Sequence, residues 1–299
     1  MDSLPMQMPL WTEIEDRAES VVNVAQIPQR SPFRYPGGKT WLVPHIRAWL
    51  KASPAPKLFV EPFVGGGIVS LTVAFEELAE HIIMSELDEN VSALWKTILS
   101  DDSEWLVERI LTFEMTAEAV REELSRTPEC EREIGFQTLL RNRTCHGGIM
   151  APGSGVMKHG ENGRGIASRW YPKTLATRIQ RIAAIRNRIT FHHADGLAFM
   201  REHARERNAS FFIDPPYTAG KNGKRAGRRL YACNEVDHES LFAISKTLAG
   251  RFLMTYDDAD EIVEMAERSG FVSTTVSMKN THHAQMQELL IGRDLSWLR

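Results

Sequence analysis

Apolar positions recur along the chain in patterns that divide it into strands and helices. The runs "KLFVEPF" (57–63) and "HIIMSE" (81–86) are short, apolar and bounded by turn or acidic residues, which is typical of buried strands. The stretch "IVSLTVAFEELAE" between them has the length and composition of a helix. Because a helix joins the two strands, we predict that they pair in parallel.

The second half of the chain repeats this alternation, and its middle departs from it. We predict further strands in "ITFHHAD", "SFFIDPPY", "RFLMTY", "FVSTTVSM" and "QELLIGR", with helices between the earlier ones. Residues 89–126 and 172–188 follow helical patterns, whereas 142–165 are rich in glycine and basic residues with little periodicity. This arrangement predicts one open α/β sheet that carries an inserted second domain.

Composition restricts the class of protein only moderately. The chain has 299 residues, of which 42% are hydrophobic and 25% charged, as in ordinary globular proteins. No apolar run approaches the roughly 20 residues of a membrane span, and the N-terminus lacks the layout of a secretory signal. The three cysteines form no Cys-x-x-Cys pair, so we expect reduced thiols, a cytoplasmic protein and no metal site. Residues 1–30 are expected to form an N-terminal arm.

The distribution of charge points to a polyanionic partner although the formal net charge is -3. From 134 to 194 the chain has ten Lys and Arg residues against one acid, Glu161. From 215 to 234 it has no acid, and its basic residues are Lys221, Lys224, Arg225, Arg228 and Arg229. Segregated positive charge is typical of a surface that faces nucleic acid. The alternative is that these are ordinary solvated faces.

Three acids fall where the predicted strands end, namely Glu61, Glu86 and Asp214. Ligands of open α/β sheets bind beyond the carboxyl ends of the strands. The glycines at 65–67 permit close approach of a ligand, although "GGGIVS" is not a dinucleotide fingerprint. A carboxylate such as Glu86 suits the two hydroxyls of a ribose, with Asp88 as the rival for that role. Both acids could instead stabilise a helix N-terminus.

The tetrapeptide "DPPY" carries the most specific chemistry. The amino group of an aromatic base is a poor nucleophile because its lone pair is delocalised into the ring. Asp214 and the Pro215 carbonyl could accept its two hydrogens and release that lone pair, and proline holds the carbonyl direction rigidly. Tyr217 offers a flat face for stacking of a base. The alternative interpretation is a turn that ends a strand.

Three motifs in this order, "FRYPGGK" (33–39), "VEPFVGGG" and "DPPY", resemble those of the Dam-type (D12 class) site-specific DNA N6-adenine methyltransferases. The resemblance extends from about Ser31 to the end of the chain. It implies a Rossmann-like, SAM-dependent methyltransferase sheet that is mostly parallel with a C-terminal antiparallel hairpin. The catalytic domain would comprise 31–100 and 186–299, and a mainly helical and loop target-recognition domain would be inserted at 101–185.

The resemblance also implies roles for individual residues. Asp214, Pro215 and Tyr217 take the catalytic positions. The cofactor S-adenosylmethionine would be bound by Tyr35, Lys39, Phe63, Gly65, Gly67, Glu86, Asp195 and Asp214. In particular, the Lys39 ammonium suits the methionine carboxylate, and Asp195 lies where an acid near the adenine ring is expected. The segment "LLRNRTCHGGIM" resembles the start of the recognition insert, so Arg141, Asn142, Arg143 and His146 join the five basic residues of 221–229 as DNA-binding candidates.

The expected function is therefore methyl transfer to N6 of adenine within a specific double-stranded DNA sequence, by base flipping and without a metal. We expect a monomer, with a dimer as the alternative, that is bacterial or phage-encoded and acts at the nucleoid, as in restriction-modification. Three other functions stay open. They are methylation of N4 of cytosine, methylation of an RNA base, and DNA binding without catalysis, which would require no cofactor.

Overall fold

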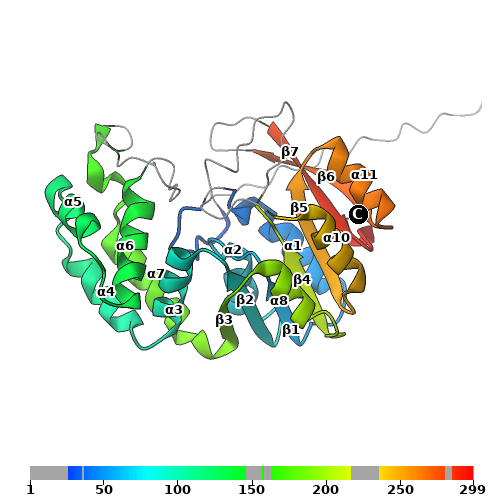
Figure 1. The fold of residues 1–299 in the computed structure, drawn as a ribbon, viewed down its shortest axis with the longest axis horizontal. Coiled ribbons are helices and arrows are strands. Elements are labelled where there is room, and N and C mark those ends of the chain that lie inside the picture. Colours follow the sequence, from blue (N-terminus) through cyan, green and yellow to red (C-terminus); the bar gives the residue numbers. More distant parts are fainter. Residues whose placement is uncertain are drawn as a thin grey trace, which may run out of the picture.

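The computed structural model describes residues 26–35, 37–145, 157, 160, 163–216, 236–279 and 285–298. Its centre is a seven-stranded sheet with the order β3-β2-β1-β4-β5-β7-β6 (Figure 1). The strands are β1 (Leu58–Glu61), β2 (His81–Glu86), β3 (Ile189–His193), β4 (Ala209–Ile213), β5 (Arg251–Asp257), β6 (Val272–Lys279) and β7 (Gln285–Gly292). Strands β1 to β5 pair in parallel, and β7 lies antiparallel between β5 and β6. The predicted parallel sheet with an antiparallel hairpin is confirmed.

Helices cover both faces of this sheet and extend beyond one edge. The α-helices are α1 (Val43–Lys51), α2 (Ile68–Phe75), α3 (Glu89–Leu99), α4 (Ser103–Thr112), α5 (Ala117–Ser125), α6 (Glu131–Thr144), α7 (Pro172–Ala184), α8 (Gly196–Glu202), α10 (His238–Thr247) and α11 (Asp260–Arg268). Short 3-10 turns are η2 (Lys39–Leu42), η5 (Ile166–Arg169), η6 (Arg186–Arg188) and η7 (Ser296–Leu298).

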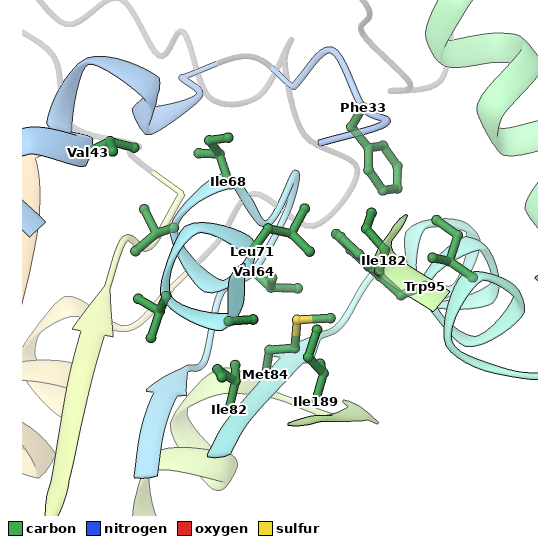
Figure 2. Close-up of a cluster of buried hydrophobic side chains, with 14 of the residues drawn as sticks. Phe33, Val43, Val64, Ile68, Leu71, Ile82, Met84, Trp95, Ile182 and Ile189 are labelled. Carbon is green, nitrogen blue, oxygen red and sulfur yellow. The ribbon is translucent and has the colours of Figure 1, made fainter. Parts of the chain in front are cut away.

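Alternate residues of the central strands pack into two separate cores. Phe59 of β1 and Phe212 of β4 join the cluster formed with α1, α2 and α3, part of which Figure 2 shows. Their neighbours Val60 and Phe211 join the opposite cluster, formed with α8, α10 and α11. Successive side chains of a strand point to opposite faces. A strand buried on both faces therefore reads as a continuous apolar run, which is why the sequence pattern located these strands well.

Helices α4 to α7 form a helical lobe beside the β3 edge of the sheet (Figure 1). Its core is continuous with the first cluster, because Leu106, Phe136 and Ile179 belong to the same set of contacting buried residues as Phe59. The Leu175, Ile179 and Ile182 side chains of α7 recur at helical spacing and are buried, so one face of this helix packs on the core. The boundaries 101–185 for an inserted domain stay a prediction.

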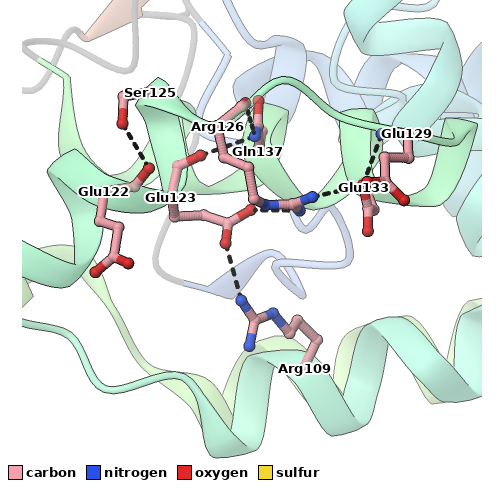
Figure 3. Close-up of polar contacts among 8 residues, drawn as sticks. All are labelled: Arg109, Glu122, Glu123, Ser125, Arg126, Glu129, Glu133 and Gln137. Atoms are coloured by element: carbon pink, nitrogen blue, oxygen red, sulfur yellow. Dashed lines mark hydrogen bonds and ion pairs between the residues drawn. The ribbon is translucent and has the colours of Figure 1, made fainter.

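A polar cluster fastens α5 to its neighbours in this lobe (Figure 3). The buried Glu123 carboxylate accepts hydrogen bonds from Arg109 Nη2 at 2.9 Å and from Arg126 Nη2 at 3.2 Å. Gln137 Nε2 donates to the carbonyl oxygens of Glu123 and Arg126, both at 2.8 Å. Because a buried carboxylate needs partners of this kind, loss of its charge would weaken the lobe.

Candidate active site

The carboxyl ends of β2, β1 and β4 lie side by side, so the three acids predicted to cluster come to one edge of the sheet. Glu61 is the last residue of β1, Glu86 is the last of β2, and Asp214 directly follows β4. Glu61 and Asp214 are close enough for each charge to affect the other. The sequence-based placement of these acids at the strand ends agrees with the structure.

Lys39 joins the first motif directly to the "DPPY" aspartate. Its ammonium lies 2.9 Å from Asp214 Oδ1 and 3.0 Å from Glu288 Oε1, and it donates to the Gly37 carbonyl at 3.0 Å. These three acceptors match the three N–H groups of a lysine ammonium. The contact of Lys39 with a cofactor carboxylate stays a prediction. Sequence reasoning missed both the ion pair with Asp214 and the role of Glu288, because no local pattern connects positions so far apart.

Asp214 is oriented by a second donor on the neighbouring strand. Thr255 Oγ1 of β5 donates to Asp214 Oδ1 at 2.8 Å, so one carboxylate oxygen receives hydrogen bonds from both Lys39 and Thr255. The Asp214 side chain keeps 21% of its area exposed, whereas Lys39 keeps only 5%. The carboxylate is therefore fixed in direction yet accessible. Pro215 follows it directly, and Tyr217 lies outside the described residues.

The glycine loop after β1 is enclosed by two aromatic rings. Gly65 and Gly67 have φ values of +46° and +65°, in the left-handed region that favours glycine. A Cβ atom would lie 2.7 Å from Tyr35 Cε1 at position 65, and 2.6 Å from Trp95 Cζ2 at position 67. Trp95 Nε1 also donates to the Gly65 carbonyl at 2.9 Å. The predicted residues Tyr35, Gly65 and Gly67 therefore form one packed unit, and sequence reasoning missed Trp95.

Glu86 connects the end of β2 to this loop. Its carboxylate accepts hydrogen bonds from the backbone N–H groups of Gly65 at 3.0 Å, Leu87 at 2.9 Å and Asp88 at 3.0 Å. Burial raises the pKa of Glu86, and these hydrogen bonds oppose the rise. Asp88 instead caps α3, since its Oδ1 accepts from the N–H groups of Asn90 and Val91. The ribose-binding role of Glu86 stays a prediction.

Phe63 packs against the start of α8, the helix that Asp195 caps. Asp195 caps α8 by accepting a hydrogen bond from the N–H of Ala198 at 2.8 Å. Phe63 lies directly against Gly196, the first residue of that helix, where a Cβ atom would overlap the phenyl ring. Two of the residues predicted to bind the cofactor thus lie at the same end of α8. Their contact with a cofactor stays a prediction.

The predicted DNA-binding residues divide into three groups. Arg141 is exposed on α6, whereas Asn142 and Arg143 are buried. Asn142 exchanges two 2.8 Å hydrogen bonds with the Arg34 backbone, and Arg143 donates to the Pro32 carbonyl. These two side chains hydrogen-bond to the backbone of residues 32–34, just before the Gly-Gly-Lys motif, and hold that segment in place. The third group, His146 and the five basic residues of 221–229, lies outside the described residues.

Burial also shifts the pKa of two side chains near the site, Arg143 and Glu61. It lowers the pKa of Arg143 to about 9, with further lowering by the positive charges of Arg178, Arg34 and Arg169. It raises the pKa of Glu61 to about 8, although Glu61 Oε2 accepts a 2.9 Å hydrogen bond from the Ser70 N–H at the start of α2. The Glu61 carboxyl is thus largely protonated near neutral pH in the free protein.

We expect Glu61→Gln to change how stability depends on pH. The folded-state pKa of about 8 exceeds the ordinary value of 4.5, so the folded protein holds a proton that the unfolded chain releases. Wild-type stability should therefore fall as pH rises between these values, by on the order of 3 kcal/mol. Glutamine is always neutral and removes this fall. Urea unfolding at about pH 5 and about pH 8.5 measures the difference, and an equal effect of the substitution at both pH values would contradict it.

Two further observations concern metals and membranes. Within the described ranges, no group of three His, Cys, Asp or Glu side chains is placed to hold a metal ion. Among the same residues, no helix has the length and apolar composition needed to cross a bilayer.

Comparison with known proteins identifies the class. The sequence model of the D12 class N6 adenine-specific DNA methyltransferases matches residues 35–280. The chain therefore belongs to this family, whose members act on DNA with S-adenosylmethionine. The matched region includes the Lys39, glycine-loop and Asp214 segments and the helical lobe. A search of curated proteins found no match.

Solved structures show only distant likeness. A putative RNA methyltransferase from Pyrococcus horikoshii has 10% sequence identity and a TM-score of 0.38, with 87% of this chain and 84% of that chain covered. A SAM-dependent methyltransferase from Agrobacterium tumefaciens has 10% identity and a TM-score of 0.39, with 85% and 60% covered. An rRNA methyltransferase from Streptomyces viridochromogenes has 13% identity and a TM-score of 0.36, with 87% and 86% covered. The functional assignment rests on the family.

Proposed function

We propose that this protein methylates N6 of an adenine within a specific sequence of double-stranded DNA, and that the adenine is flipped out of the duplex. The observation that carries the proposal is the fixed Asp214 carboxylate at the end of β4, held by Lys39 and Thr255 and followed at once by Pro215. Extrusion of a base costs a few kcal/mol, which contacts in the pocket offset. We further propose that the enzyme acts as a monomer in the cytoplasm of a bacterium or phage-infected cell.

In this proposal the adenine amino group donates one hydrogen to Asp214 and the other to the Pro215 carbonyl, while the base stacks on Tyr217. S-adenosylmethionine supplies the methyl group on a positively charged sulfur. As the N6–carbon bond forms, the carbon–sulfur bond breaks and its electron pair stays on sulfur, so that S-adenosylhomocysteine would leave. Positive charge moves to N6, and one N6 proton then leaves to solvent. The Asp214 carboxylate stabilises the charge that develops, and the fixed geometry supplies much of the rate.

The remaining predicted residues take supporting roles. Tyr35, Lys39, Phe63, Gly65, Gly67, Glu86 and Asp195 would bind the cofactor. The chemistry of the site fits that group, since the Glu86 carboxyl at the end of β2 suits the hydroxyls of a ribose, and the glycine loop beside it permits close approach of a ligand. Arg141, His146, Lys221, Lys224, Arg225, Arg228 and Arg229 would contact DNA, with Asn142 and Arg143 acting through the segment they brace. The helical lobe and the glycine-rich, basic residues 142–165 would read the target sequence.

The decisive experiment is methyl transfer from labelled S-adenosylmethionine to unmethylated duplex DNA, followed by nucleoside analysis. We expect N6-methyladenine, with duplex DNA preferred over RNA of the same sequence. N4-methylcytosine would overturn the choice of base, and methylated RNA alone would overturn the choice of nucleic acid. Cofactor binding without transfer to either polymer would contradict the proposed reaction.

A further inference from the structure

Glu288 occupies a position where an acid is costly. It lies on β7, an interior strand of the sheet, and keeps only 3% of its area exposed. The residue opposite it on the neighbouring strand β5 is another acid, Asp257. A buried carboxylate loses its hydration, and an acid directly opposite adds repulsion whenever both are ionised. Stability alone therefore gives little reason for a glutamate at this position.

The contacts of Glu288 lead to the reacting centre. Glu288 Oε1 lies 3.0 Å from Lys39 Nζ, and the same nitrogen lies 2.9 Å from Asp214 Oδ1. One ammonium is thus shared by two carboxylates, and the formal charges of these three groups sum to −1. Asp257 and Glu61 also stand near this group, and burial raises the pKa of both carboxyls, which favours their neutral forms.

We propose that Glu288 is a positioning residue that offsets the charge of Lys39, so that Asp214 acts as an anion toward the adenine amino group. This inference rests on the proposed function. Lys39 next to Asp214 would by itself neutralise the carboxylate that must stabilise positive charge developing on N6. Glu288, on β7, pairs with the same ammonium, so the group of Lys39, Asp214 and Glu288 keeps a net negative charge. Together with the Gly37 carbonyl, it also fixes where Lys39 stands.

A purely structural role for Glu288 makes a different prediction. If Glu288 only attached β7 to the Gly-Gly-Lys segment, glutamine would replace it well, because glutamine keeps the size and an acceptor oxygen for Lys39. Aspartate, which is one methylene shorter, would replace it poorly. If the charge matters, the order is reversed, and aspartate retains more activity than glutamine.

The test measures kcat and KM for Glu288→Gln and Glu288→Asp with duplex DNA and S-adenosylmethionine. We expect Glu288→Gln to lower kcat about 30-fold with KM values changed by less than about 3-fold, as for loss of an interaction made in the transition state. Glu288→Asp should keep most of kcat. The matched control is Glu76→Gln, at a partly buried glutamate that caps the end of α2 and is ion-paired with Arg30 and Arg47, which should lower the unfolding temperature and leave kcat within about 2-fold.

A paired variant gives a second readout. Lys39→Met/Glu288→Gln removes one positive and one negative charge together, so at saturating cofactor its kcat should exceed that of Glu288→Gln alone. The inference is overturned if Glu288→Gln retains wild-type kcat, if glutamine serves better than aspartate, or if the paired variant shows no recovery. A wild-type enzyme that makes no N6-methyladenine would instead refute the proposed function, so the two failures are distinguishable.

Discussion

Asp214→Asn is expected to lower kcat for DNA methylation by about 1000-fold, the largest effect of any single substitution considered. Asparagine has the size of aspartate and retains an oxygen that can accept from Thr255, whereas it lacks the negative charge that would stabilise N6 as it gains the methyl group. Lys39 keeps its contact with Glu288, so the fold around the site should persist. Steady-state kinetics with radiolabelled cofactor measures the loss.

Two controls separate this effect from misfolding and from loss of cofactor. The dissociation constant for S-adenosylmethionine should change by less than about tenfold, because the loss concerns the transferred charge. Asp237→Asn tests the same chemical change at the exposed cap of α10, where asparagine caps a helix as well as aspartate does. It should leave kcat unchanged. An Asp214→Asn enzyme within tenfold of wild type would exclude an essential electrostatic role for this carboxylate.

Gly67→Ala is expected to destabilise the fold by about 3 kcal/mol or more. Two costs add at this position. A φ of +65° costs a residue with a side chain about 1–2 kcal/mol, and the new methyl group would lie 2.6 Å from the buried Trp95 ring, which must shift. Because that ring also hydrogen-bonds the Gly65 carbonyl, cofactor binding should weaken as well. Urea unfolding and cofactor titration measure the two effects.

Gly270→Ala isolates the first of these costs. Gly270 has a φ of +75° and no atom within 4 Å of an added Cβ, so alanine there meets backbone strain without a clash. We expect a loss of about 1 kcal/mol. If the two substitutions destabilised the protein equally, packing of Trp95 against the loop would contribute nothing to the requirement for glycine at 67.

The strands and the acids at their ends could be predicted from sequence because both depend on local patterns. Buried strands such as β1 and β4 read as apolar runs, and the residue that ends each strand is fixed once the run is found. Residue types at fixed spacing also distinguished the motifs around Lys39 and Asp214. The C-terminal antiparallel hairpin followed from the family resemblance. The place of β7 between β5 and β6 was not predicted, since no local pattern encodes strand order.

Contacts between distant segments could not be predicted in this way. Asn142 and Arg143 were expected to face DNA because the segment "LLRNRTCHGGIM" resembles the start of the family's recognition insert. In the structure they are buried, since the backbone of 32–34 supplies their partners. The pairing of Lys39 with Glu288 and the packing of Trp95 on Gly67 likewise depend on the tertiary fold. No sequence signal near either residue indicates them.

The position of β7 has a consequence for protein synthesis. This strand is translated after all the other strands of the described sheet, yet it fills an interior place and brings Glu288 to Lys39. Domains begin to fold from the N-terminus while the ribosome is still adding residues. A nascent chain can therefore assemble the glycine loop after β1 early, whereas the Lys39 ion pair with Glu288 forms only when β7 emerges. Chains that terminate before β7 would lack Glu288. Only chains translated through β7 would therefore methylate DNA at the full rate.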